Sequence, residues 1–159
     1  MEKGGAHQDA QESTPPNMKA RRVFASGTFD LFHLGHLQFL ERAKRMGEEL
    51  IVGVQTDERV VQTRGRAPVY PLWHRLRLVS ALACVDIAVP VNGPDDELDV
   101  VTNNAEIWAV GPEFAQLPGH ESLPEKLQAM GIRCVLISRT PDISTTSIKR
   151  RIRNGKEES

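Results

Sequence analysis

The sequence contains few of the residues that stabilise small secreted or metal-binding proteins. Only two cysteines occur among its 159 residues, Cys84 and Cys134, and each lies in apolar surroundings far from the other. Disulfide frameworks and zinc sites need closely spaced cysteines, so we expect both to be reduced, buried thiols. Reduced thiols are typical of cytoplasmic proteins, and we expect this compartment for the chain.

Strong net charge and long apolar runs are also absent. The formal net charge is −1 at pH 7, which gives no reason to expect nucleic acid or an acidic membrane surface as a partner. No apolar run approaches the roughly 18 residues needed to span a bilayer, and no signal-peptide pattern is present. With 40% hydrophobic and 26% charged residues, the composition is that of one globular domain.

Three common motifs of phosphate and metal chemistry are missing. The sequence has no G-x-G-x-x-G, so the dinucleotide-binding fingerprint does not apply, and it has no P-loop motif G-x-x-x-x-G-K-[ST]. It also lacks H-E-x-x-H, the zinc motif of many metalloproteases. Any phosphate site must therefore be built from other residues.

The chain begins with a polar segment that lacks periodicity. Residues 1–20 are rich in Gly, Gln, Glu, Ser and Pro, which predicts a disordered leader. We expect residues 21–153 to form a single domain and residues 154–159 to form a C-terminal tail.

Strand and helix patterns alternate along this domain. Apolar runs predict five strands, near residues 22–26, 50–54, 85–91, 106–110 and 132–137. Amphipathic or capped segments predict helices at residues 34–46, from residue 71 onward, after the acidic turn at 92–97, at 123–130 and at the basic C-terminal end. Residues 56–71 are expected to be a polar connection. The alternation predicts an α/β fold, with a parallel five-stranded sheet and helices on both faces.

The most informative stretch is GTFDLFHLGH, from Gly27 to His36, at the junction of the first strand and the first helix. A glycine-bearing turn at a helix start presents N–H groups and the positive end of the helix dipole to an anion. His33 and His36 lie three residues apart there and would face the same anion. Two other interpretations stay open: the histidines could bind a metal together with Asp30, or they could serve as a helix cap and a packed ring.

Two further polar segments, residues 111–114 and 139–147, also follow predicted strands. Ligands of such parallel sheets bind beyond the carboxyl ends of the strands, where the strand order reverses. We therefore expect these two segments to converge with residues 27–36. The hydroxyl residues that open the last helix are candidates for a second anion site, or for a plain helix N-cap.

These motifs resemble those of a known family. H-x-G-H after G-T-F-D, together with RTPDISTT near the C-terminus, is similar to the cytidylyltransferase branch of the nucleotidyltransferase superfamily. Glycerol-3-phosphate cytidylyltransferases and the adenylyltransferase domain of ADP-heptose synthesis share this pattern, and the resemblance covers residues 22–152. It implies a Rossmann-like domain, a homodimer and Mg²⁺ as cofactor. It also implies transfer of CMP from CTP to a small acceptor that carries a phosphate or phosphonate, with release of pyrophosphate.

The resemblance further implies roles for individual residues. The catalytic candidates, which would bind and neutralise the phosphates, are His33, His36, Arg64, Arg66 and Arg139. The nucleotide-binding candidates are Gly27, Thr28, Phe29, Asp30, Gly35, Gly111, Glu113, Thr140, Ile143, Ser144, Thr145 and Thr146. The acceptor-binding candidates are Asp57, Trp73 and Arg75. No direct protein ligand to a metal is expected, with Asp30 as the one candidate.

The chain departs from the family pattern where the acceptor and the base would bind. Between Asp57 and His74, family members have lysines that bind the phosphates, whereas this chain has only arginines, and the two side chains are not interchangeable. Trp73 replaces a glutamate of the family, residues 111–114 replace G-D-D, and Asp142 replaces a glycine. These changes predict an altered acceptor. They leave two alternatives, an ATP-dependent adenylyltransferase and a catalytically silent nucleotide-binding or regulatory protein.

Overall fold

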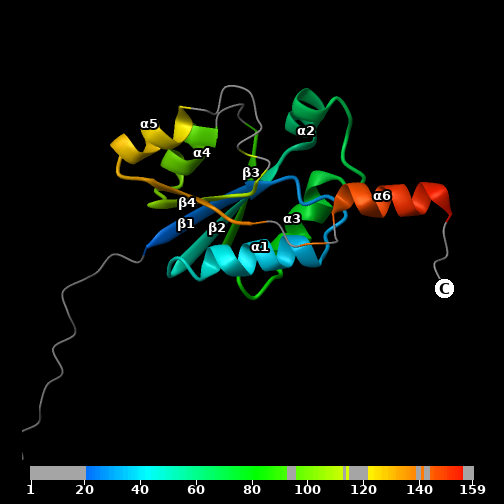
Figure 1. Ribbon diagram of the computed structural model, residues 1–159, viewed down its shortest axis with the longest axis horizontal. Helices are drawn as coiled ribbons and strands as arrows, with labels where there is room; N and C mark the ends of the chain where they lie inside the picture. The colour runs from blue at the N-terminus through cyan, green and yellow to red at the C-terminus, as the bar shows by residue number, and fades with distance from the viewer. Residues whose placement is uncertain are drawn as a thin grey trace, which may run out of the picture.

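The structure is a computed structural model that describes residues 21–92, 96–112, 114, 122–138, 141 and 144–155. The predicted leader, residues 1–20, lies outside the described residues, as do residues 156–159 of the predicted tail. The described residues form one sheet with helices packed against it (Figure 1).

Five parallel strands make up the sheet of the described residues, in the order β3-β2-β1-β4-β5. They are β1 (Arg22–Gly27), β2 (Glu49–Gln55), β3 (Ile87–Val91), β4 (Ile107–Val110) and β5 (Arg133–Leu136). Strand β1 pairs with both β2 and β4, so the strand order reverses between β1 and β4. The sheet confirms the predicted α/β class, the Rossmann-like domain and each of the predicted strands.

The described residues also contain six helices, which are α1 (Leu34–Lys44), α2 (Asp57–Arg64), α3 (Leu72–Ser80), α4 (Asp96–Thr102), α5 (Leu123–Ala129) and α6 (Thr145–Asn154). Five of them match predicted helices. Helix α2 corrects the expectation that residues 56–71 form a polar connection without a helix.

Helix α2 forms from local signals rather than from an apolar face. Only Arg59 and Val60 among its residues are buried, so apolar periodicity is almost absent from this segment. The Thr56 side chain caps the first turn by accepting a hydrogen bond from the Arg59 N–H (3.2 Å). Gly65 ends the helix in the left-handed conformation, with φ of 70°. A capping threonine followed by a glycine just past the end would have identified the helix.

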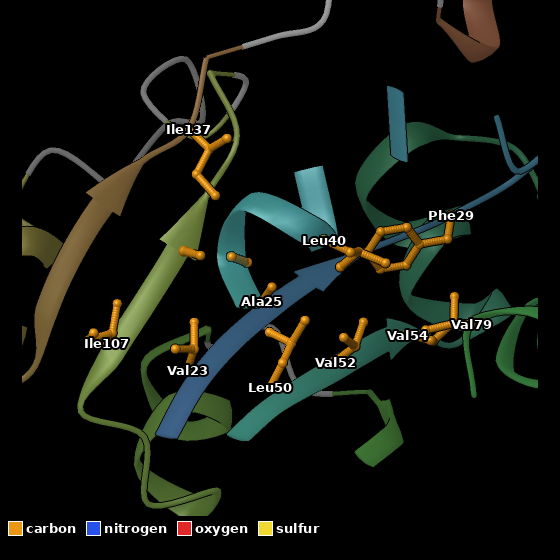
Figure 2. Packing of buried hydrophobic residues seen from close by; sticks show 12 residues of the cluster. Val23, Ala25, Phe29, Leu40, Leu50, Val52, Val54, Val79, Ile107 and Ile137 are labelled. Carbon is orange, nitrogen blue, oxygen red and sulfur yellow. The ribbon is translucent and has the colours of Figure 1, made fainter. Parts of the chain in front are cut away.

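Apolar side chains alternate between the two faces of the sheet. Val23 and Ala25 of β1 belong to a cluster on the face of α1 and α3, whereas Phe24 between them packs with residues of α4 and α5. Figure 2 shows the first cluster, in which Leu40 from α1 and Val79 from α3 pack against the strands. Helices therefore cover both faces of the sheet, as predicted.

Both cysteines are free thiols, and the structure corrects the expectation that they are fully buried. Both are half-buried, and this burial raises the pKa of the Cys84 and Cys134 thiols. Within the described ranges, no group of three or more His, Cys, Asp or Glu residues could hold a metal ion. None of the helices in the described part of the chain combines the length and apolar character needed to cross a membrane.

Candidate active site

A cavity of about 530 Å³ lies at the carboxyl ends of β1 and β4, where the strand order reverses. This volume is within the range of small-molecule binding clefts. The described residues that line it come from all three predicted segments and include Gly27, Thr28, Phe29, Asp30, His33, Gly35, His36, Gly111, Pro112, Phe114, Ser144, Thr145 and Thr146. The predicted convergence is therefore confirmed for the described residues. Four predicted site residues lie outside the described residues: Glu113, Arg139, Thr140 and Ile143.

Both histidines of the H-x-G-H motif cap the first turn of α1, and each does so through its own Nδ1 atom. His33 Nδ1 accepts a hydrogen bond from the Gly35 N–H (3.1 Å), and His36 Nδ1 accepts one from the His33 N–H (3.4 Å). A neutral imidazole that accepts at Nδ1 carries its proton at Nε2, so this pattern assigns an Nε2–H donor to each ring. The two histidines therefore act as helix caps, which is one of the interpretations that the sequence left open. Each of them also lines the cavity and carries an N–H donor.

The two imidazole rings stack on each other, with centroids 3.8 Å apart. Burial lowers the pKa of His33 below its usual value of 6.5, so the neutral form of this ring dominates at pH 7. At this point the site therefore presents N–H donors rather than a fixed positive charge.

The backbone between β1 and α1 turns sharply. Phe29 and Leu31 adopt left-handed φ angles of 52° and 47°, which are unusual for residues that carry a Cβ. Such strain costs on the order of 1–3 kcal/mol per residue and persists only where the surroundings enforce it. The buried Phe29 ring provides part of that support, and it lies so close to Gly27 that a Cβ there would be 3.0 Å from it. Gly27 therefore makes room for the Phe29 ring.

Asp30 connects this turn to two segments that are distant in the sequence. Its carboxylate accepts hydrogen bonds from the backbone N–H groups of Val69 (2.9 Å) and Tyr70 (3.0 Å) and forms an ion pair with Lys149 (3.0 Å). Burial alone would raise the pKa of Asp30, but the hydrogen bonds from Val69 and Tyr70 and the ion pair with Lys149 together lower it below 3.8. Asp30 is therefore an ionised carboxylate at neutral pH that holds these segments together.

Asp30→Asn is expected to lower the free energy of unfolding at neutral pH by about 1–3 kcal/mol, because the buried donors lose a charged acceptor. Folding lowers the pKa of Asp30, so its stabilising contribution is complete above the unfolded-state pKa of about 3.9 and is lost as the pH falls through the folded-state pKa. Urea unfolding at a series of pH values measures the difference between wild type and variant. That difference should shrink in acid.

Glu41→Gln is the matched control, because Glu41 is an exposed carboxylate in the middle of α1. Its unfolding curve should follow that of the wild type at every pH. A constant difference between wild type and Asp30→Asn across the whole range would contradict the assigned direction of the pKa shift.

The N-terminus of α6 lies beside the same turn. Ser144 and Ser147 form a capping box at this end of the helix, which confirms the N-cap interpretation. The Thr145 hydroxyl donates a hydrogen bond to the Asp30 carbonyl oxygen (2.9 Å), and Thr146 lies in the cavity wall. The first turn of α6 therefore borders the cavity that the H-x-G-H motif also lines.

Lys149 is a cavity cation that the sequence analysis missed. It lies one helical turn after Thr145, lines the cavity and pairs with Asp30. The cations expected from the sequence to bind phosphate were Arg64, Arg66 and Arg139, and Lys149 was not among them. The spacing of four residues between Thr145 and Lys149, which places both on one face of the last helix, was the available signal.

Arg64 and Arg66 also line the cavity, where the end of α2 meets the following loop. Both residues are exposed. Together with Lys149, they are the Lys and Arg side chains among the described lining residues. These positions are compatible with the predicted phosphate-binding role.

The three predicted acceptor-binding residues are not among the described residues that line the cavity. Arg75 is 0% exposed, and its guanidinium donates to the carbonyl oxygens of Thr28 (2.6 Å) and Tyr70 (2.8 Å) and to the Asp57 carboxylate (2.5 Å). Trp73 is 71% exposed on the surface of α3. Arg75 and Asp57 join the turn after β1 to α2 and α3. The structure does not bring the three residues into the described cavity wall, and an acceptor-binding role for them stays a prediction.

A parallel sheet with helix N-termini at its point of strand reversal is typical of α/β proteins that bind nucleotides or other phosphate ligands. The model of the cytidylyltransferase-like family matches residues 24–151, a range that includes the described cavity residues. The chain therefore belongs to the cytidylyltransferase-like family, and it is an enzyme of the nucleotidyltransferase kind.

Relatives of the chain are named for different products. The chain is 41% identical over 120 residues to FAD synthase of Thermococcus onnurineus, covering 75% of this chain and 79% of the relative. It is 32% identical over 135 residues to glycerol-3-phosphate cytidylyltransferase of Bacillus subtilis, covering 83% and 97%. The crystal structure of a lipopolysaccharide core biosynthesis protein from Thermoplasma volcanium is similar, with a TM-score of 0.64, 30% identity and coverage of 78% and 99%. The family membership that the sequence motifs predicted is therefore confirmed.

Proposed function

We propose that the protein transfers CMP from CTP to a phosphate or phosphonate oxygen of a small acceptor. The acceptor oxygen bonds to the α-phosphorus, the bond from that phosphorus to the α,β-bridging oxygen breaks, and pyrophosphate leaves. One observation carries the proposal: two imidazoles whose Nδ1 atoms accept backbone hydrogen bonds and the N-terminus of a second helix line the same cavity. Phosphoryl-type transfer needs positioning and charge stabilisation more than covalent chemistry from the protein.

His33 and His36 are assigned to the α-phosphate. Negative charge grows on the bridging oxygen as pyrophosphate leaves, and a preorganised N–H donor stabilises that charge in the transition state. The positive end of the α1 dipole adds to this effect. An acceptor phosphate or phosphonate is already ionised, so the reaction needs no general base, and Asp30 can keep its hydrogen bonds from the Val69 and Tyr70 N–H groups.

The β- and γ-phosphates are assigned to the start of α6 and to the cavity cations. Ser144, Thr145 and Thr146 open a helix whose dipole favours an anion at this end. Lys149 offers an ammonium group that family members supply from a different segment, between the positions of Asp57 and His74. A bound triphosphate would compete with Asp30 for this ammonium group.

Mg²⁺ is proposed to bind together with the triphosphate. The Asp30 carboxylate already accepts hydrogen bonds at both oxygens, and the described residues contain no cluster of acidic, His or Cys side chains for a metal. Mg²⁺ usually keeps several waters and binds through substrate phosphates, so these residues fit a Mg²⁺–nucleotide complex. In that complex the ion neutralises phosphate charge.

ATP is the second candidate donor. The match over 97% of the Bacillus subtilis glycerol-3-phosphate cytidylyltransferase supports CTP. The 41% identity with an archaeal FAD synthase supports ATP, because FAD contains an AMP unit. Both candidates require the same attack on the α-phosphorus.

A substrate screen with the full chain tests the proposed function. Pyrophosphate release is measured with each of four nucleoside triphosphates and Mg²⁺, combined with glycerol-3-phosphate, riboflavin 5′-phosphate and small phosphonates. We expect CTP and at least one acceptor to turn over together, whereas either substrate alone gives no release. Turnover only with ATP would replace CTP by the second candidate. Nucleotide binding in calorimetry without turnover in any combination would contradict the proposal and favour a silent nucleotide-binding protein.

Arg64→Ala and Arg66→Ala are each expected to raise KM for the triphosphate or the acceptor by about 10-fold or more, because a hydrogen bond to a charged group contributes about 1.5–3 kcal/mol. Initial rates with one substrate varied at a time identify which of the two is affected. Arg77→Ala is the control, because Arg77 is an exposed arginine of α3 that is not among the residues lining the cavity. Equal kinetics in all three variants and the wild type would remove both arginines from the site.

A further inference from the structure

Trp108 is one of the β4 residues that line the cavity. It pairs in register with Phe24 of β1 and Cys134 of β5, and its side chain is 1% exposed. It lies in the cavity wall together with Val110 and Phe114, and the Phe114 ring packs edge-on against it with centroids 4.7 Å apart. This part of the wall is aromatic and apolar.

The indole nitrogen of Trp108 is buried and has no hydrogen-bond partner among the described residues. Buried N–H groups are nearly always paired in native proteins, because leaving one unpaired costs free energy. A phenylalanine at this position would fill the apolar wall without that cost. The unpaired indole N–H therefore indicates a ligand that supplies the missing acceptor.

We propose that Trp108 is a nucleoside-binding residue, whose Nε1–H donates a hydrogen bond to an acceptor atom of the nucleobase. This inference rests on the proposed function. The groups assigned to phosphates, such as His36, Arg64 and Lys149, come from α1, the end of α2 and α6, so the apolar β4 side is left for the uncharged part of the nucleotide. An indole N–H only donates, so it selects a base carbonyl oxygen or an unprotonated ring nitrogen. Both cytosine and adenine offer such an atom.

The indole nitrogen is covered from solvent, so a nucleobase reaches it only when a neighbouring wall side chain moves aside. Phe114 is the wall residue in ring contact with the indole. Nucleotide binding therefore changes the surroundings of the Trp108 ring. Inorganic triphosphate has no base. It should bind only to the protein groups assigned to the phosphates and leave the wall around Trp108 unchanged.

The protein has only two tryptophans, so Trp73→Phe makes Trp108 the single indole fluorophore. In this variant, CTP or ATP with Mg²⁺ should shift or quench the emission, and inorganic triphosphate with Mg²⁺ should not. In a second experiment, Trp108→Phe should raise KM for the nucleotide about 10-fold with little change in kcat, and should leave the affinity for inorganic triphosphate unchanged. Trp73→Phe removes an indole N–H from the exposed surface and should keep the wild-type KM for the nucleotide.

Two results would overturn the inference while the proposed function stands: an unchanged nucleotide KM in Trp108→Phe, or an equal emission response to inorganic triphosphate. An equal loss of affinity for nucleotide and for inorganic triphosphate in Trp108→Phe would also overturn it, because that result describes a packing defect. Failure of the wild type to bind any nucleotide would remove the proposed function and the inference together.

Discussion

His36→Ala is expected to lower kcat by about 10²–10³-fold, the usual effect of removing one donor that stabilises developing charge in a transition state. His36 lines the cavity, and its Nδ1 accepts a hydrogen bond from the His33 N–H, which assigns the donor to Nε2. KM for the nucleotide should change much less, because the lost interaction is strongest in the transition state. Steady-state kinetics with saturating acceptor measure both constants.

His36→Asn separates catalysis from helix capping. The asparagine amide can occupy the position of Nδ1 and keep the contact with the His33 N–H, but it provides no donor at the position of Nε2. We expect this variant to keep its thermal stability and to lose activity as His36→Ala does. His74→Ala controls for loss of an imidazole, because His74 packs against Tyr70 and Trp73 and is not among the cavity-lining residues. A wild-type kcat in both His36 variants would remove this histidine from the mechanism.

Arg75→Met is expected to lower the free energy of unfolding by about 2–4 kcal/mol, because two backbone carbonyl oxygens lose a charged donor. The Asp57 side chain is 38% exposed, so water solvates much of the charge that is left behind. The Arg75 guanidinium is fully buried, and its loss leaves the carbonyl oxygens of Thr28 and Tyr70 and the Asp57 carboxylate without this donor. Because Thr28 belongs to the turn between β1 and α1, the geometry of the H-x-G-H motif should loosen as well. Chemical denaturation, monitored by circular dichroism, measures the free energy of unfolding.

Arg77→Met is the matched control for this experiment. Arg77 lies two residues further along α3 and is exposed, so its replacement should change stability by less than about 0.5 kcal/mol. Arg75→Lys keeps a charge but offers fewer donors in a different geometry, and we expect an intermediate loss of stability. Equal stability of the two methionine variants would contradict the structural role assigned to Arg75.

The sheet could be predicted because its strands are buried on both faces and therefore appear as continuous apolar runs. Leu50, Ile51 and Val52 of β2 are an example: all are buried, with alternate residues in the clusters on opposite faces. Helix α2 could not be found in this way, because it buries only Arg59 and Val60 and its ends depend on single capping residues. Apolar periodicity reports burial and therefore misses a helix that lies mostly in solvent.

The candidate site was predictable where its chemistry resides in one local motif, and not where it depends on contacts between distant residues. His33 and His36 cap the same helix turn, and their spacing of three residues was enough to predict that the two side chains lie together. The role of Arg75 depends on the carbonyl oxygen of Thr28, 47 positions away, and a backbone carbonyl leaves no mark on residue type. The pairing of Lys149 with Asp30 spans 119 positions and was hidden for the same reason.

The central claim is that the protein transfers a nucleotidyl group, and it is tested most directly by asking whether the α- or the γ-phosphorus of the nucleotide reaches the acceptor. The wild-type protein is incubated with Mg²⁺, the nucleotide and acceptor that release pyrophosphate in the screen, and nucleotide labelled with ³²P at either the α or the γ position. Attack at the α-phosphorus predicts that α-label moves to the acceptor and that γ-label leaves as pyrophosphate, in equal amounts. Transfer of γ-label to the acceptor, or its release as orthophosphate, would contradict nucleotidyl transfer at this site.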